Sequence, residues 1–366
     1  PGMPAGERLE AWDDLTGLSL DPRGVLDARR QELEYIDQKN VWDVVPREEA
    51  RRNGWKIIKS RWIDVNKGDD ISAQYRSRLV GKEFADKRID GLFAGTPPLE
   101  ALRFLVHEAA TVEGSGIVGD GSQEEKVIMI NDVARAFFEA KAIRKICVEL
   151  PDECAESRGG RNVGLLKQSL YGTRDAAMNW QEEVAKEMGK WGFRRGTYNP
   201  CLYAHDEWKI QVFLHGDDFA SVGSRTSLRR FLEKLESRFE IKTSVIGTGV
   251  GEVQEARVLN RILRITSNGW EYEPDQRHAE MIVEQLGLKE AKAVETPTEE
   301  EKKWEAEENA QELNPDRSRV FRSVAARCNY IAADREAQRR RPVVRVERQR
   351  QKFPGSVAEV RGQALG

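Results

Sequence analysis

Two pairs of segments alternate apolar with polar residues and predict β-hairpins. Residues 55–66 alternate along most of their length, are followed by a Lys-Gly-Asp turn signal at 67–69, and resume as residues 75–80. Residues 208–214 carry apolar side chains at every second position, and residues 219–222 return after a polar turn. Because the side chains of a strand point alternately to opposite faces, each hairpin is expected to turn one apolar face to a core.

Other patterns predict a buried strand and a set of helices. Residues 127–130 are four consecutive apolar residues, which is typical of a strand buried on both faces. The opening of the chain, to about residue 23, is rich in Gly, Pro and Asp and is interpreted as a leader or linker. Helices are expected at residues 25–40, 99–111, 228–239, 279–287 and 320–333.

Composition limits the class of protein. The 366 residues are 39% hydrophobic and 33% charged, which excludes a collagenous or fully disordered chain. No apolar run approaches the ~18 residues of a membrane helix, and the first ten residues lack the apolar core of a signal peptide, so we expect a soluble intracellular chain without a membrane partner. The net charge of −3 (59 Lys and Arg against 62 Asp and Glu) leaves a locally basic cleft open. The four cysteines form no CxxC and are expected to be reduced packing residues.

Three carboxylates stand where strands end or turn. Asp132 follows the apolar run at 127–130, and Asp217 and Asp218 lie in the turn of the second hairpin. Mg²⁺ prefers oxygen ligands and keeps several waters, so one or two carboxylates and the phosphates of a substrate are enough to bind it. Adjacent residues of a strand point to opposite sides, so we expect Asp217 to bind metal with Asp132, and Asp218 to support them. The alternative is that Gly-Asp-Asp is an ordinary polar turn.

An ordered series of motifs resembles a known family. The motifs are NVWDVVP at 40–46, YRSRLVGK at 75–82, NDVARAFF at 131–138, LKQSLYG at 166–172 followed by Trp180, FLHGDD at 213–218, ETPT at 295–298, and FRS at 321–323 with Asn329 and Tyr330. Together they resemble the reverse transcriptase region of copia-type retrotransposon Pol polyproteins, over residues 27–335.

The resemblance implies an α+β right-hand polymerase fold with fingers, palm and thumb, in which an antiparallel palm sheet is backed by helices. The regions that we expect are a leader or linker at 1–24, mainly fingers at 25–125, a palm with the catalytic carboxylates and an inserted fingers segment at 126–245, the end of the palm and a thumb-like region at 246–298, a linker and a helix preceding a missing ribonuclease H domain at 299–334, and an Arg-rich disordered tail at 335–366.

The resemblance also implies RNA-directed DNA synthesis and assigns the residues that carry it. Asp132, Asp217 and Asp218 take the three catalytic carboxylate positions, which bind two Mg²⁺ ions, with Mn²⁺ as a substitute. Phe137 falls where the family has an aromatic ring beneath the incoming sugar, a ring that would clash with a 2′-hydroxyl. Ordinary core packing is the alternative role of that ring.

Further substrate-binding residues are expected on the first hairpin and after residue 166. Arg76, Arg78 and Lys82 are on the hairpin that the resemblance assigns to the fingers, and the two arginines share a face from which they can bind a triphosphate. A solvated strand face is the alternative. The resemblance implies that Tyr171 and Gly172 lie against the template–nucleotide pair, where glycine permits close approach of the backbone.

Departures from the family pattern keep a second function open. His215 and Gly216 replace Tyr-Val before the aspartates, and we expect this to loosen the turn. The first hypothesis is an active RNA-directed DNA polymerase, and the second is a truncated, inactive retrotransposon relic that keeps the fold and binds nucleic acid weakly. A P-loop kinase or ATPase is disfavoured because GxxxxGK[ST] is absent.

The resemblance implies partners and a cellular location. The expected partners are an RNA template, a DNA primer and dNTPs, and the ribonuclease H and integrase parts of a Pol polyprotein lie outside this chain. Replication of copia-type elements implies a cytoplasmic virus-like particle, with nuclear entry to follow. The basic tail after residue 335 is either a nuclear signal or out-of-frame sequence.

Overall fold

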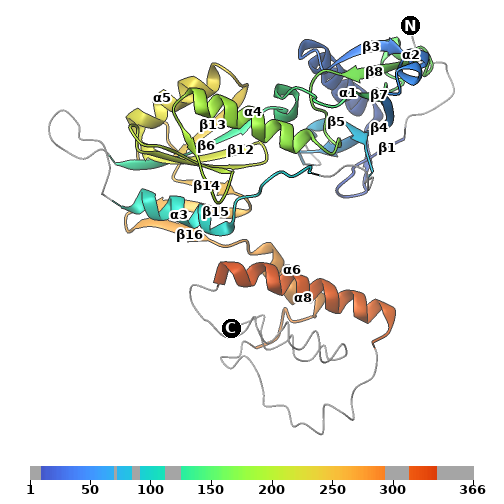
Figure 1. The fold of residues 1–366 in the computed structure, drawn as a ribbon. Helices are drawn as coiled ribbons and strands as arrows, with labels where there is room; N and C mark the ends of the chain where they lie inside the picture. The colour runs from blue at the N-terminus through green and yellow to red at the C-terminus, as the bar shows by residue number, and fades with distance from the viewer. Residues whose placement is uncertain (1–9, 70–71, 85–90, 112–124, 293–312, 336–366) are drawn as a thin grey trace. The chain divides into compact units, whose positions relative to one another are not determined.

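The fold is described from a computed structural model, which describes residues 10–69, 72–84, 91–111, 125–292 and 313–335. Figure 1 shows the order of the helices and strands. The described residues form two compact units. The first comprises those up to Pro97, Glu125, and those from Met129 to Thr243; the second comprises 98–111, 126–128 and those from Ser244 onward. The tail at 336–366 and the linker at 299–312 lie outside the described residues.

A five-stranded sheet of the first unit contains the first predicted hairpin. Its order is β3-β8-β7-β4-β5, with bounds Trp42–Pro46, Asn162–Leu166, Ile146–Glu149, Lys56–Asn66 and Tyr75–Lys82. The hairpin β4–β5 is confirmed and is antiparallel from Lys59 opposite Lys82 to Asn66 opposite Tyr75. Helices α1 (Pro22–Gln38) and α2 (Arg47–Arg52) belong to the same unit. The helix expected at 25–40 begins earlier, because Asp21 caps it and Pro22 suits its first turn.

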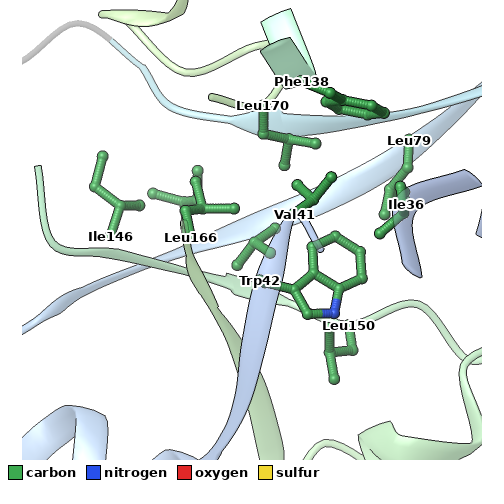
Figure 2. Packing of buried hydrophobic residues seen from close by; sticks show 11 residues of the cluster. Ile36, Val41, Trp42, Leu79, Phe138, Ile146, Leu150, Leu166 and Leu170 are labelled. Atoms are coloured by element: carbon green, nitrogen blue, oxygen red, sulfur yellow. The ribbon is translucent and has the colours of Figure 1, made fainter. Parts of the chain in front are cut away.

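An apolar cluster joins α1 to this sheet, and Figure 2 shows it closely. Ile36 of α1, Trp42 of β3 and Leu79 of β5 are buried together. Phe138, in the short 3-10 helix η1 (Ala136–Glu139), and Leu170 pack into the same cluster. The cluster therefore ties the segments that follow β6 and β8 to the hairpin β4–β5.

A six-stranded sheet contains the buried strand and the second predicted hairpin. Its order is β13-β6-β12-β11-β10-β9, with bounds Ile241–Ile246, Lys126–Val133, Asp218–Ser224, Ile210–His215, Leu202–His205 and Arg194–Arg195. The strand predicted at 127–130 is longer and includes Asp132. The hairpin β11–β12 is confirmed, although Trp208 lies in the turn before β11.

Two helices pack on the residues around this sheet. They are α4 (Ala176–Lys190) and α5 (Arg225–Glu236). Trp180 of α4 lies edge-on against Phe239, with ring centroids 5.3 Å apart. The helix expected at 228–239 begins at Arg225 because the Oγ of Ser224 accepts a hydrogen bond from the backbone N–H of Ser227. The α+β class and the antiparallel sheet with helices, both predicted, are confirmed.

The opening of the chain forms a hairpin where a leader or linker was expected. Strands β1 (Ala11–Trp12) and β2 (Ser19–Leu20) pair antiparallel. Asp13 explains the structure, because one of its oxygens accepts hydrogen bonds from the N–H groups of Leu15 and Thr16, and the other accepts one from Asn66 on β4. The hairpin was not predicted because these contacts depend on two short polar segments far apart in the sequence.

The described part of the second unit contains a three-stranded sheet and the helices α3, α6 and α8. Strands β14 (Glu255–Val258), β15 (Arg261–Thr266) and β16 (Gly269–Glu273) form an antiparallel sheet. Helix α3 (Leu99–Ala110) lies beside β16, where Arg103 stands 5.8 Å above the ring of Tyr272. Helices α6 (Arg277–Gln285) and α8 (Pro315–Arg335) pack through Ile282 and Val324. Within the described residues, no helix is both long enough and apolar enough to cross a membrane.

Candidate active site

The aspartates of β6 and of the β11–β12 turn meet at one end of the six-stranded sheet. The backbone N–H of Val133 donates a 3.1 Å hydrogen bond to the carbonyl of Asp217, and the Oγ of Ser221 donates one of 3.2 Å to the carbonyl of Met129. These contacts run in opposite directions along β6 and β12, so they set Asp132 across from the turn. Asp132 is exposed, and Asp217 and Asp218 are half-buried.

Gly216 and Asp217 form a tight two-residue turn. His215 pairs with Asp218 across the hairpin, and Gly216 takes the left-handed φ of 63°. Glycine adopts this conformation at little cost, which suits the first position of such a turn. The indole Nε1 of Trp180 donates a 2.7 Å hydrogen bond to the carbonyl of Gly216. The turn is therefore anchored to α4, whereas the sequence predicted that Gly216 would loosen it.

Asp218 is affected by the charges of the other two carboxylates. Burial and, to a smaller extent, the negative charges of Asp217 and Asp132 together raise the pKa of Asp218 to about 6. Carboxylates are the hard oxygen donors that a divalent ion prefers. Among the described residues, however, no three His, Cys, Asp or Glu side chains are grouped closely enough to hold one ion. The donor set therefore fits Mg²⁺ through one or two carboxylates, and a closed protein cage is not formed.

Two arginines of β5 lie near these carboxylates. Burial lowers the pKa of Arg76, and the positive charges of Arg78 and Arg135 lower it further, whereas Asp132 opposes them. The guanidinium of Arg78 lies 5.2 Å above the ring of Tyr171. Arg76 and Asp132 therefore lie close enough for their charges to interact.

Lys82 is separate from Arg76. It is exposed at the far end of β5, six residues further on, which corresponds to about 20 Å along a strand. Its neighbour Gly81 donates a 2.7 Å backbone hydrogen bond to the carbonyl of Tyr171. The structure therefore brings Lys82 beside the Tyr171–Gly172 segment and leaves it distant from Arg76.

The backbone of Gly172 lies so close to that of Gly81 that only glycine fits at this position. It has a φ of 82°, and an added Cβ would stand 2.0 Å from the carbonyl oxygen of Gly81. Tyr171 beside it contacts Phe137, with ring centroids 4.5 Å apart. Phe137 is half-buried, while its neighbour Phe138 is in the core. Phe137, Tyr171 and Arg78 thus form one continuous stack.

A buried cluster of charged side chains next to Arg78 was not predicted from the sequence. Glu32 of α1 is fully buried, and its Oε2 accepts a 2.7 Å hydrogen bond from the Nε of Arg135. Its Oε1 lies 3.7 Å from the Nη1 of Arg78. The sequence did contain a sign of this burial, because Glu32 lies four residues from each of the buried residues Ala28 and Ile36 and so shares their face of the helix.

A second missed cluster fixes the end of β5. Arg144 donates two 2.8 Å hydrogen bonds to the carboxylate of Glu83, and it also pairs with Asp175. The backbone N–H of Arg174 donates a further 2.9 Å hydrogen bond to Glu83. Burial raises the pKa of Glu83, but these hydrogen bonds and that from Lys56 outweigh burial and hold it at about 2. The cluster holds the segment after Gly172 against the hairpin.

Comparisons with known proteins identify a family. The model of the family described as "Reverse transcriptase (RNA-dependent DNA polymerase)" matches residues 39–300. The chain is 23% identical to the retrovirus-related Pol polyprotein from transposon TNT 1-94 of Nicotiana tabacum, over 75% of this chain and 20% of that protein. It is also 23% identical to the Pol polyprotein from transposon RE1 of Arabidopsis thaliana, over 56% of this chain and 13% of that protein. The chain therefore spans about a fifth or less of these relatives.

Solved structures of lower similarity were also found. A foamy viral protease–reverse transcriptase in complex with double-stranded DNA has a TM-score of 0.47 and 9% identity, over 99% of this chain and 49% of that one. A truncated apo telomerase from Candida tropicalis has a TM-score of 0.37 and 8% identity, over 70% of this chain and 61% of that one.

Proposed function

Because this chain belongs to the reverse transcriptase (RNA-dependent DNA polymerase) family, we propose that it extends a DNA primer on an RNA template. The primer 3′-hydroxyl loses its proton to solvent and its oxygen forms a bond to the α-phosphorus of a dNTP, while the bond from that phosphorus to the oxygen that bridges to the β-phosphate breaks and releases pyrophosphate. The observation that carries the proposal is the convergence of Asp132 with Asp217 and Asp218, where Val133 hydrogen bonds to the carbonyl of Asp217.

Asp132, Asp217 and Asp218 are the residues that would hold divalent ions. Two Mg²⁺ ions, or Mn²⁺ as a substitute, supply charge neutralisation at the attacking and leaving oxygens when bound. The protein holds these carboxylates rigidly, because Asp132 lies on an inner strand of the sheet and the turn that contains Asp217 is hydrogen-bonded to Trp180. Burial and the negative charges of Asp217 and Asp132 raise the pKa of Asp218, and a bound cation would offset that unfavourable charge.

The stack of Arg78, Tyr171 and Phe137 supports a nucleotide site beside the carboxylates. Arg76 and Arg78 bind the triphosphate, for which the guanidinium fork offers paired hydrogen bonds. Phe137 lies beneath the sugar and excludes a 2′-hydroxyl, and its half-buried ring favours this role over core packing. Gly172 lies with Tyr171 against the template–nucleotide pair, and Lys82 contacts the nucleic acid nearby.

The separate sheets support an assignment of the regions of a right-hand polymerase. We assign the fingers to the sheet of β3, β4, β5, β7 and β8, and the palm to the sheet that contains β6 and β12. The strands β14–β16 are assigned to the end of the palm, and α6 to the thumb-like region. The ribonuclease H and integrase activities are assigned to other parts of a Pol polyprotein, and synthesis to a cytoplasmic particle before nuclear entry.

The test is incorporation of dTTP on poly(rA)–oligo(dT) with Mg²⁺. Wild-type protein is compared with Asp217→Asn, and Asp206→Asn serves as the control because its side chain is 77% exposed and pairs only with the exposed Arg194 among the described residues. Incorporation by the wild type and the control that disappears in Asp217→Asn supports the proposal. A folded wild-type protein that binds primer–template without incorporating dTTP refutes it and favours the inactive relic.

A further inference from the structure

The carboxylate of Glu32 has no part in the chemistry proposed above, yet it lies among the arginines of the candidate site. It is bound by Arg135 at 2.7 Å and stands 3.7 Å from the Nη1 of Arg78. Among the described residues, neither the Oε1 of Glu32 nor the Nη1 of Arg78 has a hydrogen-bond partner. Both atoms are buried, so the two groups interact as charges in a medium that screens them weakly.

Arg78 is held from its other side by an aromatic ring. Its guanidinium lies 5.2 Å above Tyr171, and Tyr171 lies 4.5 Å from Phe137. The side chain of Arg78 is 17% exposed, and a cation at that depth needs compensation for the water it has lost. Glu32 is the only carboxylate that forms an ion pair with Arg78 among the described contacts. The orientation of Arg78 therefore depends on Glu32 and Tyr171 together.

Glu32 is itself fixed, because Arg135 is anchored independently. Arg135 has a left-handed φ of 47° and follows Asp132 by three residues, in the turn that ends β6. Its guanidinium lies 3.9 Å above the ring of Tyr35, and the hydroxyl of Tyr35 donates a 2.8 Å hydrogen bond to Glu240. A continuous set of contacts thus leads from the turn after Asp132, through Glu32, to Arg78 on β5.

We propose that Glu32 is a positioning residue for nucleotide binding, which holds Arg78 in one orientation for the triphosphate of the incoming dNTP. The inference rests on the proposed function. A guanidinium that is already oriented loses less conformational freedom when it binds a polyphosphate, so the affinity for the nucleotide rises. Arg76, which is exposed, receives no such support from Glu32 in the described contacts.

The experiment measures equilibrium binding of labelled dTTP, with Mg²⁺, to the protein bound to a poly(rA)–oligo(dT) primer that ends in a dideoxynucleotide. Such a primer blocks chemistry, so binding is read without turnover. Glu32→Gln is expected to weaken dTTP binding by up to about tenfold, which is the cost of ordering one freed arginine side chain on binding. In the incorporation assay, KM for dTTP should rise by a similar factor while kcat changes less. Glu34→Gln, an exposed position on the same helix, should bind dTTP as the wild type does.

A double variant separates positioning from simple charge balance. Glu32→Gln with Arg135→Gln removes both members of the close pair and restores the balance of buried charge. If Glu32 merely neutralises Arg135, the double variant recovers both thermal stability and dTTP affinity, and the inference is overturned. If Glu32 positions Arg78, thermal stability recovers but dTTP affinity stays low.

The remaining outcomes distinguish this inference from the proposed function. Wild-type incorporation together with unchanged dTTP binding in Glu32→Gln overturns the inference alone. A wild-type protein that binds dTTP more tightly than Glu32→Gln but does not incorporate it refutes the polymerase activity and supports the role of Glu32. Absence of dTTP binding to every variant overturns the inference.

Discussion

Gly172 offers the sharpest test of the candidate site, because its substitution changes one contact of known size. In Gly172→Ala, the new Cβ would stand 2.0 Å from the carbonyl oxygen of Gly81 in the present backbone. Ordinary contacts of this kind are more than an ångström longer, so the Tyr171–Gly172 segment must withdraw from β5. The 2.7 Å hydrogen bond from the N–H of Gly81 to Tyr171 is then lost or stretched.

The expected loss of stability follows from three separate costs. A left-handed residue with a Cβ costs about 1–2 kcal/mol, overpacking costs about 1–3 kcal/mol, and a lost hydrogen bond costs about 1 kcal/mol. Together they amount to roughly 3–6 kcal/mol, which corresponds to a fall in Tm of roughly 6–24 °C at about 2–4 °C per kcal/mol. Because Tyr171 moves away from Arg78 and Phe137, KM for dTTP should also rise.

Gly159 provides the matched control. It has a φ of 65°, but an added Cβ there would meet no atom within 4 Å. Gly159→Ala should therefore show the backbone cost alone, about 1–2 kcal/mol, with an unchanged KM for dTTP. Thermal unfolding by circular dichroism and steady-state incorporation are measured for both variants. Equal losses of Tm in the two variants would refute the claim that close approach to Gly81 requires the glycine.

Two further predictions concern the ion cluster and the turn. The hydrogen bonds that hold the pKa of Glu83 at about 2, below its ordinary 4.5, give stability that is present above about pH 4.5 and is lost as pH falls toward 2. Urea unfolding between pH 7 and pH 3 should therefore show a steeper acid loss in the wild type than in Glu83→Gln, and equal slopes would contradict the assignment. Trp180→Phe removes the hydrogen bond to Gly216 and should lower kcat about tenfold. Trp191→Phe, which alters the same aromatic cluster, should not lower kcat, and an equal fall in both variants would assign the loss to packing.

Patterns within one segment were sufficient to predict a strand or a turn when the directions of its side chains depend on that segment alone. The alternation over 75–80 predicted β5, and with it the shared face of Arg76 and Arg78. The Gly-Asp-Asp turn was predicted from the flanking strands, since a two-residue turn between alternating segments closes a hairpin. In both cases the signal lies within about ten residues, and the periodicity of the side chains carries it.

Contacts between elements that are far apart in the sequence could not be predicted from such local patterns. Strand β1 was missed because its pairing partner is two residues long and its stability depends on Asp13 reaching Asn66 of β4. The pairing of Asp132 with Asp217 was expected from their positions at strand ends, but the order of strands in the sheet, β6 beside β12, cannot be read from either segment. Pairings between strands depend on all competing partners, and a single segment does not reveal them.

Glu32 shows why a buried charge is the hardest feature to assign from sequence. Its position on α1 matches the spacing of the buried Ala28 and Ile36, but a glutamate at such a position equally indicates the edge of an apolar face. The choice between these two interpretations depends on whether cationic side chains contact the carboxylate. Its two partners come from β5 and from the turn after β6, which are far from α1 in the sequence. A carboxylate buried without partners would be strongly destabilising, so the burial of Glu32 depends on the two arginines that contact it. The same reasoning explains why the cluster lies beside Asp132: the turn that ends β6 fixes Arg135, and the strand that contains Arg78 is fixed by the hairpin.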